Sequence, residues 1–296
     1  MKEYGVVVLN YMNFALTEKC VDNILQKETD VFVVIVDNAS PNESYDELRQ
    51  HYKNSKDVLT IRNEANNGYS AGNNCGFRKI KEVHPEIDYY CVLNPDAEIT
   101  ENNTFKALKR VLETHEDIAV CAPTMLLNHK YIPCETGYGV LPKVKDIYKR
   151  HFLLYRGNDN RIKDFALDVL DDNIAYVDFV IGACFMIKRV ALESIGYMDE
   201  GTFMYNEEAI LSIHLTKIGY KEAVLLDLLY SHNHQRSAPR RDVHAKLHAE
   251  KRGYISRKYL CENYYDGQGL LRLKIAHMLN VFYLVLAATY HKFKHD

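Results

Sequence analysis

The sequence lacks two short motifs that identify common nucleotide-binding enzymes. No G-x-G-x-x-G follows the first apolar run, YGVVVLN (4–10), which argues against a dinucleotide-binding fold. The chain also has no G-x-x-x-x-G-K-[ST] segment, which excludes a P-loop. Its chemistry must therefore come from acids, asparagines and histidines placed elsewhere.

The chain also lacks a basic excess and a regular cysteine pattern. The formal net charge is -3, so the composition gives no signal for a nucleic-acid partner. The seven cysteines are odd in number and form no C-x-x-C pair, which predicts a reducing compartment without a disulfide framework or a zinc knuckle. The N-terminal stretch shows no basic region or cleavage site, so we expect no secretory signal and a cytoplasmic protein.

No stretch free of Lys, Arg, Asp and Glu is long enough to span a bilayer. The C-terminal stretch Ile275–Tyr290 has 16 such residues, short of the ~20 required. It lies in a basic segment, since Ser231–Asp296 carries 12 Lys and Arg against 5 Asp and Glu. This pattern predicts a helix on an anionic membrane surface. A helix buried against the domain or against a partner in a homodimer is the alternative. The flanking bases are Arg272, Lys274, Lys292 and Lys294.

Apolar runs alternate with segments of helical periodicity through the first 122 residues. This rhythm predicts right-handed βαβ units and an α/β fold, in which a mostly parallel open sheet carries helices on both faces. The expected strands are 4–10, 31–37, 57–63, 88–94 and 117–123, and the expected helices are 14–27, a segment to about 53, 70–82 and 101–115.

The second half of the chain is less regular. It contains a strand-like run at 175–189, a helix within 196–220, a strand at 221–229 and a helical tail after residue 240. We expect one domain over 1–240, with halves 1–122 and 123–240, and a basic and apolar helical extension over 241–296.

Polar residues follow several of the expected strands. Asp37, the turn 66–74, Asp96 and Glu98 all come directly after a strand. Because ligands bind at the carboxyl ends of the strands in an open parallel sheet, we expect these residues to converge on one edge.

The segment LNPDAEIT (93–100) places two carboxylates two residues apart. Asp96 and Glu98 offer oxygen ligands that suit Mg²⁺ or Mn²⁺ bound together with substrate phosphates. His232 and His234 follow a later strand, and a histidine ligand would favour Mn²⁺. The alternatives are that Asp96 is a turn or helix-capping residue and that His232 is a hydrogen-bonded histidine at a strand end.

The segment MYNEEAIL places Glu207 and Glu208 together at the start of an expected helix. Acids are favoured electrostatically at helix N-termini, which is a sufficient structural reason for both. The functional interpretation is that one of these two glutamates is a general base.

Together these pieces resemble a family 2 glycosyltransferase of the GT-A fold, in particular the bacterial rhamnosyltransferase-like branch. In the N-terminal half the resemblance rests on VVVLNYMN, the nucleotide-binding aspartate segment VIVDNASPNES, the donor loop RNEANNGYSAGNNCGF and the D-x-D stretch LNPDAEI. Further on it rests on the acceptor-side strand GACFMIKR, the catalytic-base helix FMYNEEAIL and the metal-binding histidine segment HNHQRS.

The resemblance implies an inverting transferase for a dTDP- or UDP-sugar donor, with a glycan or lipid-linked glycan acceptor in bacterial surface polysaccharide synthesis. Residues 1–122 would form the nucleotide-sugar half and 123–240 the acceptor half. The donor would be bound by Tyr11, Asp37, Asn66, Gly68, Asn73, Asn74 and Asp96. The membrane-facing tail would place the enzyme on the inner face of the plasma membrane.

The resemblance also implies the metal and the base. Asp96 and His232 would hold Mn²⁺ or Mg²⁺, while Glu98 stands where the family has the second aspartate. Glu208 stands at the usual position of the base, and Glu207 would orient the acceptor hydroxyl. A sugar-phosphate nucleotidyltransferase is the alternative, although NYMNFALTE is not the glycine-rich loop which that class needs. A catalytically inactive relative that only binds a sugar nucleotide is another.

Overall fold

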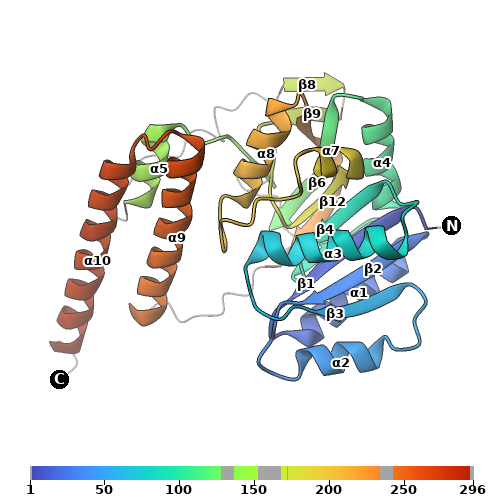
Figure 1. The fold of residues 1–296 in the computed structure, drawn as a ribbon, viewed down its shortest axis with the longest axis horizontal. Helices are drawn as coiled ribbons and strands as arrows, with labels where there is room; N and C mark the ends of the chain where they lie inside the picture. The colour runs from blue at the N-terminus through green and yellow to red at the C-terminus, as the bar shows by residue number, and fades with distance from the viewer. Residues whose placement is uncertain (1, 128–136, 153–167, 172, 234–242, 294–296) are drawn as a thin grey trace. The chain divides into compact units, whose positions relative to one another are not determined.

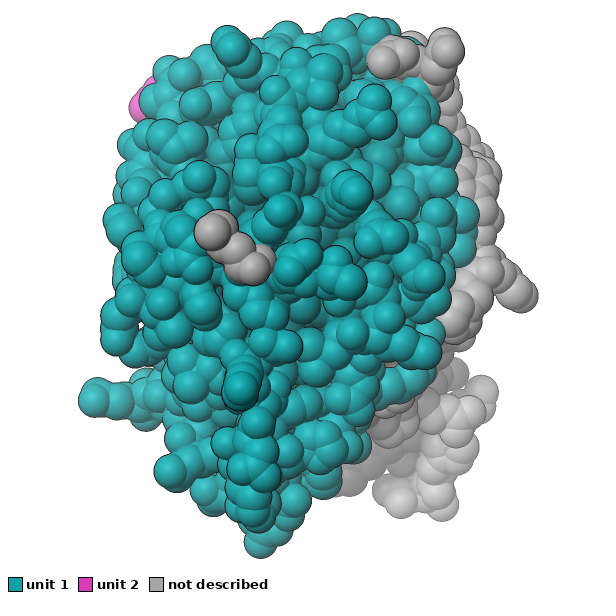
Figure 2. Space-filling view, turned by 90° about the vertical axis from the view of Figure 1, so that its right-hand side faces the viewer, with its two compact units in different colours: residues 1–140, 160–200, 207–234 teal, residues 141–159, 201–206, 235–296 magenta. Residues whose placement is uncertain are grey.

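A computed structural model describes residues 2–127, 137–152, 168–171, 173–233 and 243–293. The chain divides into two compact units. The sheet unit comprises Met1–Val140, Asn160–Glu200 and Glu207–His234. The helical unit comprises Leu141–Asp159, Gly201–Asn206 and Gln235–Asp296. Figure 2 shows one face of the sheet unit as a continuous surface.

The sheet unit is built on a ten-stranded sheet in the order β3-β2-β1-β4-β11-β6-β12-β9-β8, with β5 paired to β12 (Figure 1). Neighbouring strands are parallel from β3 to β4, and β6 is parallel to β12, whereas β11 is antiparallel to both of its neighbours. The strands are β1 (Tyr4–Asn10), β2 (Val31–Asp37), β3 (Val58–Arg62), β4 (Tyr89–Leu93), β5 (Ala97–Ile99), β6 (Ile118–Leu127), β8 (Asp168–Asp171), β9 (Ile174–Val177), β11 (Cys184–Lys188) and β12 (Lys221–His232). A separate pair joins β7 (Tyr138–Gly139) to β10 (Phe179–Val180).

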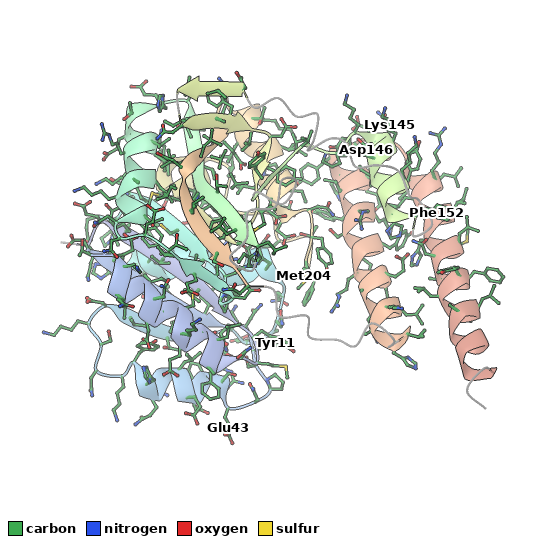
Figure 3. All side chains as sticks on the ribbon, turned by 180° about the vertical axis from the view of Figure 1, so that it is seen from behind. Tyr11, Glu43, Lys145, Asp146, Phe152 and Met204 are labelled. Carbon is green, nitrogen blue, oxygen red and sulfur yellow. The ribbon has the colours of Figure 1, made fainter. Side chains whose placement is uncertain are left out.

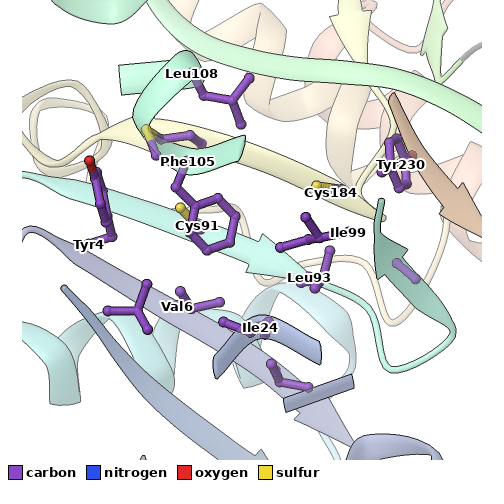
Figure 4. Close-up of a cluster of buried hydrophobic side chains, with 14 of the residues drawn as sticks. Tyr4, Val6, Ile24, Cys91, Leu93, Ile99, Phe105, Leu108, Cys184 and Tyr230 are labelled. Carbon is purple, nitrogen blue, oxygen red and sulfur yellow. The ribbon is translucent and has the colours of Figure 1, made fainter. Parts of the chain in front are cut away.

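Helices cover both faces of the sheet, as predicted. They are α1 (Phe14–Lys27), α2 (Ser44–His51), α3 (Tyr69–Val83), α4 (Thr104–Thr114), α7 (Arg189–Ser194) and α8 (Glu207–Lys217). Successive residues of a strand point to opposite faces, so Val6 packs with α1 and α4 in one buried cluster (Figure 4) while Val7 packs with α3, α7 and α8 in another. Each buried valine of this kind stabilises the fold by roughly 1.5–3 kcal/mol.

The helical unit contains three described helices, α5 (Val144–His151), α9 (Val243–Tyr264) and α10 (Leu270–Phe293). The predicted C-terminal helical extension is therefore confirmed. The turn between α9 and α10 needs left-handed backbone at Gly267 and Gly269, with φ of 72° and 77°. By length and composition, Leu270–Ala287 in α10 could cross a membrane, and 22% of that window is buried.

The structure differs from the expectations in three places. No element was predicted between the strand 88–94 and the helix 101–115, but residues 97–99 form β5, which is too short to give a periodic signal. The run 175–189 divides into β9, β10 and β11. Strand β12 extends to His232, so this histidine lies at the end of a strand, whereas His234 and Cys134 lie outside the described residues. The described cysteines are free thiols.

Candidate active site

Asp37, the last residue of β2, is fully buried at the carboxyl edge of the sheet. Its carboxylate accepts hydrogen bonds from Asn10 Nδ2 at 2.7 Å and from the Ser40 backbone N–H at 2.9 Å. Nε of Arg62 lies 3.6 Å from the same carboxylate, and the Arg62 side chain is 44% exposed. Asp37 therefore holds the ends of β1, β2 and β3 together, and Arg62 presents its cationic side chain to solvent beside it.

Tyr11 follows β1 and is 49% exposed, so its ring is accessible at this edge (Figure 3). The next residue, Met12, has a left-handed backbone with φ of 61°. Hydrogen bonds hold this turn, because Met12 N–H donates to Ser40 Oγ at 2.8 Å and Asn42 Nδ2 donates to the Met12 carbonyl at 3.1 Å. Tyr11 and the Asp37 segment are thus parts of one connected surface.

The loop before α3 is fixed to the same edge by Asn38. Asn38 Nδ2 donates to Asn66 Oδ1 at 2.9 Å and to the Gly68 carbonyl at 3.1 Å, and Asn66 Oδ1 accepts the Gly68 N–H at 3.1 Å. Gly68 has φ of 100°, which only glycine adopts readily, and it precedes the first residue of α3, Tyr69. The predicted donor-loop residues Asn66 and Gly68 are therefore rigidly placed.

The two asparagines inside α3 have different surroundings. Asn73 is fully buried and donates to the Tyr69 carbonyl, and its Oδ1 has no hydrogen-bond partner among the described residues. Asn74 donates to the Met198 carbonyl and to Glu200 Oε1, both at 2.8 Å, and accepts the Met198 N–H. The Asn74 amide thus anchors the segment that precedes α8.

The donor segment also spells G-x-S-x-G, the pattern of a serine nucleophile elbow, as GYSAG at 68–72. Ser70 is 1% exposed and lies within α3. A nucleophilic serine must reach its substrate, so this burial argues against a serine hydrolase.

Asp96 and His232 lie together at the centre of the edge. His232 Nε2 is 3.1 Å from Asp96 Oδ1, and Asn233 N–H donates to the Asp96 carbonyl at 2.8 Å. The pairing of β5 with β12 creates this contact, because it places Ala97 opposite His232. Two potential metal ligands from distant parts of the sequence therefore adjoin.

Glu98 contacts a lysine. It lies in β5 between the buried residues Ala97 and Ile99, and its Oε2 is 3.5 Å from Nζ of Lys19 in α1. Among the described residues, Asp96, Glu98 and His232 do not form a set whose ligand atoms all lie within 4.8 Å of one another. The structure thus brings together Asp96 and His232 and leaves Glu98 paired with a lysine.

Glu208 lies in the first turn of α8, beside the loop before β11. Its Oε1 accepts the Gly182 N–H at 3.2 Å, while the Tyr69 hydroxyl donates to the Gly182 carbonyl. Burial raises the pKa of the Glu208 carboxyl, although the backbone hydrogen bonds oppose this shift. Glu207 is 8% exposed. Of the two acids, Glu208 is therefore the better candidate for a general base. Its carboxyl has a raised pKa and lies beside Tyr69, the first residue of α3.

Two buried residues near this region carried no recognisable signal in the sequence. Tyr230 is 1% exposed, and burial, with smaller contributions from Cys184, Asp96 and Glu208, raises the pKa of its hydroxyl. Glu222 accepts the Val180 N–H at 2.8 Å, and burial raises the pKa of Glu222 to about 8.

Comparison with known proteins identifies relatives of this arrangement. Residues 5–196 match the profile of glycosyl transferase family 2. The low-salt glycan biosynthesis hexosyltransferase Agl10 of Haloferax volcanii is 29% identical over 212 residues, which cover 70% of this chain but 60% of that relative.

Many solved structures share the fold. The structure of GalNAc-T7 with UDP, GalNAc and Mn²⁺ superposes with a TM-score of 0.60 at 15% identity, covering 80% of this chain and 45% of that one. The mannosyltransferase PcManGT of Pyrobaculum calidifontis, in complex with GDP-Man and Mn²⁺, superposes with a TM-score of 0.55 at 14% identity, covering 97% of this chain and 75% of that one. At these identities the comparisons establish the GT-A fold.

Proposed function

The chain belongs to glycosyl transferase family 2, and we propose that it transfers a hexosyl group from a nucleotide-diphospho-sugar to a hydroxyl group of a glycan or lipid-linked glycan. The observation that carries this proposal is the convergence of three groups within the sheet unit. Asp96 adjoins His232 at the carboxyl edge. Glu208 accepts the N–H of Gly182, and the adjacent Ala183 carbonyl accepts the N–H of Asn94, two residues before Asp96. These contacts support a metal-binding pair and a base at the neighbouring ends of β4 and β11.

In this proposal the donor lies along the carboxyl edge of the sheet. The exposed Tyr11 ring packs on the nucleoside, and Asp37 fixes the surrounding turns through Asn10 and Ser40. The remaining donor residues are those of the loop and helix that begin at Asn66, namely Asn66, Gly68, Asn73 and Asn74.

Asp96 and His232 are the residues that would hold a divalent metal. Their oxygen and nitrogen atoms lie 3.1 Å apart, a separation that two ligands of one ion can adopt with small shifts, and the set suits Mn²⁺ or Mg²⁺. When bound, such an ion neutralises the charge that develops on the diphosphate leaving group. Glu98 lies outside this set, and its pairing with Lys19 gives it a positioning role.

Glu208 acts as the general base. It removes the proton from the acceptor hydroxyl while that oxygen attacks the anomeric carbon and the bond to the diphosphate breaks. This single displacement inverts the configuration at the anomeric carbon and forms no covalent enzyme intermediate. Glu207 orients the acceptor from the same turn of α8.

We also propose that α10 binds an anionic membrane surface, on the cytoplasmic side of the plasma membrane, where a lipid-linked acceptor would be held. Its outward side chains are strongly apolar, and Leu271, Met278 and Phe282 are 72%, 62% and 63% exposed. Basic residues flank this surface at Arg272 and Lys274. Cosedimentation with vesicles containing anionic lipid tests it, since Phe282→Ser should weaken binding. Val190→Ser is the control because Val190 is 62% exposed in the sheet unit.

The function is tested by donor cleavage. Purified protein is incubated with Mn²⁺ or Mg²⁺ and a panel of UDP-, GDP- and dTDP-sugars, including dTDP-rhamnose, and free nucleoside diphosphate is measured. We expect metal-dependent release from one donor, lost in Asp96→Ala and strongly reduced in Glu208→Gln. Release of pyrophosphate from a nucleoside triphosphate and a sugar phosphate would identify a nucleotidyltransferase instead. Binding without cleavage in the presence of candidate acceptors would indicate an inactive relative.

A further inference from the structure

Three side chains of the helical unit converge on one point, and none of them has been assigned a role above. They are His151 at the end of α5, Glu250 in α9 and His277 in α10, and their ligand atoms all lie within 4.8 Å of one another. His277 Nδ1 is 2.8 Å and His151 Nε2 is 2.9 Å from the same oxygen, Oε1 of Glu250. Each of the three described helices of this unit therefore contributes one group.

The cluster is enclosed by protein. The side chains of His151 and Glu250 are 2% and 5% exposed, and that of His277 is 22% exposed. Burial favours the neutral form of Glu250, but the two adjacent histidines and Asn280 hold the pKa of its carboxyl below the ordinary value. Glu250 is therefore a carboxylate at neutral pH, as a metal ligand must be.

The hydrogen bonding of His151 Nε2 helps to distinguish a metal site from an ordinary polar cluster. Although it lies 2.9 Å from Glu250 Oε1, it makes no hydrogen bond to any described residue, because the ring does not direct this nitrogen at the oxygen. Such geometry is expected of two ligands of one ion, whose lone pairs point to a shared centre and not at each other. Ligand atoms around tetrahedral Zn²⁺ stand roughly 3.3 Å apart for bonds near 2.0–2.1 Å. Each histidine nitrogen would thus move about half an ångström away from Glu250 Oε1 to share the ion with it.

The surroundings orient the ligands. Asn280, which is 1% exposed, donates to Glu250 Oε1 at 3.1 Å and to the His151 carbonyl at 2.7 Å. The Tyr254 ring stacks on His277 with 4.0 Å between centroids and 7° between planes. Contacts of this kind fix the rotamers of metal ligands and are a regular part of metal sites.

We propose that His151, Glu250 and His277 form a binding site for a transition-metal ion, for which Zn²⁺ is the best match. Two imidazoles and one carboxylate are a known zinc ligand set that leaves a fourth position for water or an anion. Glu250 and His151 also line a cavity of about 500 Å³, which could admit that ligand, and the cations Lys246 and Arg257 on the same cavity favour an anionic one. The site does not depend on the proposed transferase activity.

Metal content tests the proposal directly. The full chain is prepared in the Asp96→Ala background, which removes the carboxylate of the proposed donor site, then loaded with Zn²⁺, desalted and analysed for metal. We expect one equivalent of Zn²⁺, lost in His277→Gln and kept in His248→Gln, which replaces an exposed histidine of α9. A Zn²⁺ content equal in the His277→Gln and His248→Gln proteins would overturn the site.

Two further measurements distinguish loss of the metal site from misfolding of the variant. The His277→Gln protein must unfold at the same temperature as its parent when both contain EDTA, and only the parent should gain stability when Zn²⁺ is added. Replacement of Zn²⁺ by Co²⁺ in the parent should give the visible absorption of a tetrahedral cobalt ion, which needs no variant. If Co²⁺ binds with only the weak spectrum of the hydrated ion, the three residues form a hydrogen-bonded cluster and no metal site.

Discussion

Replacing Gly182 by alanine should disturb the proposed base without touching it chemically. A Cβ atom built on Gly182 would lie 2.7 Å from the Tyr69 hydroxyl oxygen and 3.3 Å from Glu208 Oε1. Ordinary contacts of such an atom begin at 3.4 Å, so the Tyr69 hydroxyl would have to retreat by about 0.7 Å. That movement breaks its hydrogen bond to the Gly182 carbonyl and shifts the segment whose N–H holds Glu208.

The expected cost follows from these distances. Overpacking of this size typically destabilises a protein by about 1–3 kcal/mol. A misplacement approaching 1 Å at a catalytic group can lower the rate by about 100-fold. We therefore expect Gly182→Ala to reduce kcat for donor cleavage by about 10- to 100-fold. A smaller change is expected in KM, because the methyl group lies beside the base and not on the nucleotide.

A double-mutant cycle with Tyr69→Phe isolates the steric cause. Phenylalanine lacks the oxygen at 2.7 Å, and the next atom, the ring carbon Cζ, lies at 3.1 Å, so the double variant should recover part of the lost rate. We expect a coupling of at least 1 kcal/mol, or about fivefold in kcat. Strictly multiplicative losses, or full activity in Gly182→Ala, would refute the reasoning, and melting curves of all four proteins show whether each is folded.

Three further predictions concern the acids of the sheet unit. Because burial raises the pKa of Glu208 and a base must be deprotonated, kcat should rise with pH through a value above the ordinary 4.5, and a flat profile from pH 5 to 8 would contradict its role. Glu222 stays protonated in the fold up to about pH 8 but ionises near 4.5 when unfolded, so its stabilisation is complete below pH 4.5 and is lost as the pH rises toward 8. Glu222→Gln should then stabilise the protein at pH 7 by on the order of 3 kcal/mol, measured by denaturant unfolding, and a destabilised variant would show that the native carboxyl is ionised. Asp96→Asn should abolish donor cleavage, while Glu98→Gln should lower it less than tenfold. Equal losses in the two variants would show that Glu98 is also a metal ligand.

The strands of the first 127 residues were predictable because their apolar runs are continuous. The segments 4–10 and 31–37 were predicted at their observed bounds, since a strand buried on both faces has apolar residues at nearly every position. Strand β5 gave no such signal because its three residues are too few for periodicity, and its pairing with β12 joins residues more than a hundred positions apart.

The same limit applies to the site. The sequence indicated that Asp96 and Glu98 share an edge, but not that the alternation of β5 directs Glu98 toward Lys19. The partnership of Asp37 with Arg62 depends on the register between β2 and β3, in which these two residues stand opposite each other. Tyr230 looked like an ordinary strand residue, and its burial near the site follows only from tertiary packing. A sequence thus shows which polar groups are present, whereas the directions in which they point depend on the pairing of strands that are distant in the sequence.

The strand order has a consequence for how the protein is made. Strands β3, β2, β1 and β4 are all present once residue 93 has been synthesised, so this half of the sheet can form early. Strand β6 must wait for β11 and β12, which pair with it across about 60 to 100 residues. Such long-range pairing is slow to form and leaves strand edges exposed in the meantime. The nascent chain therefore carries an open edge at β4 until Cys184–Lys188 emerges, which makes this interval the one in which it most needs protection from aggregation.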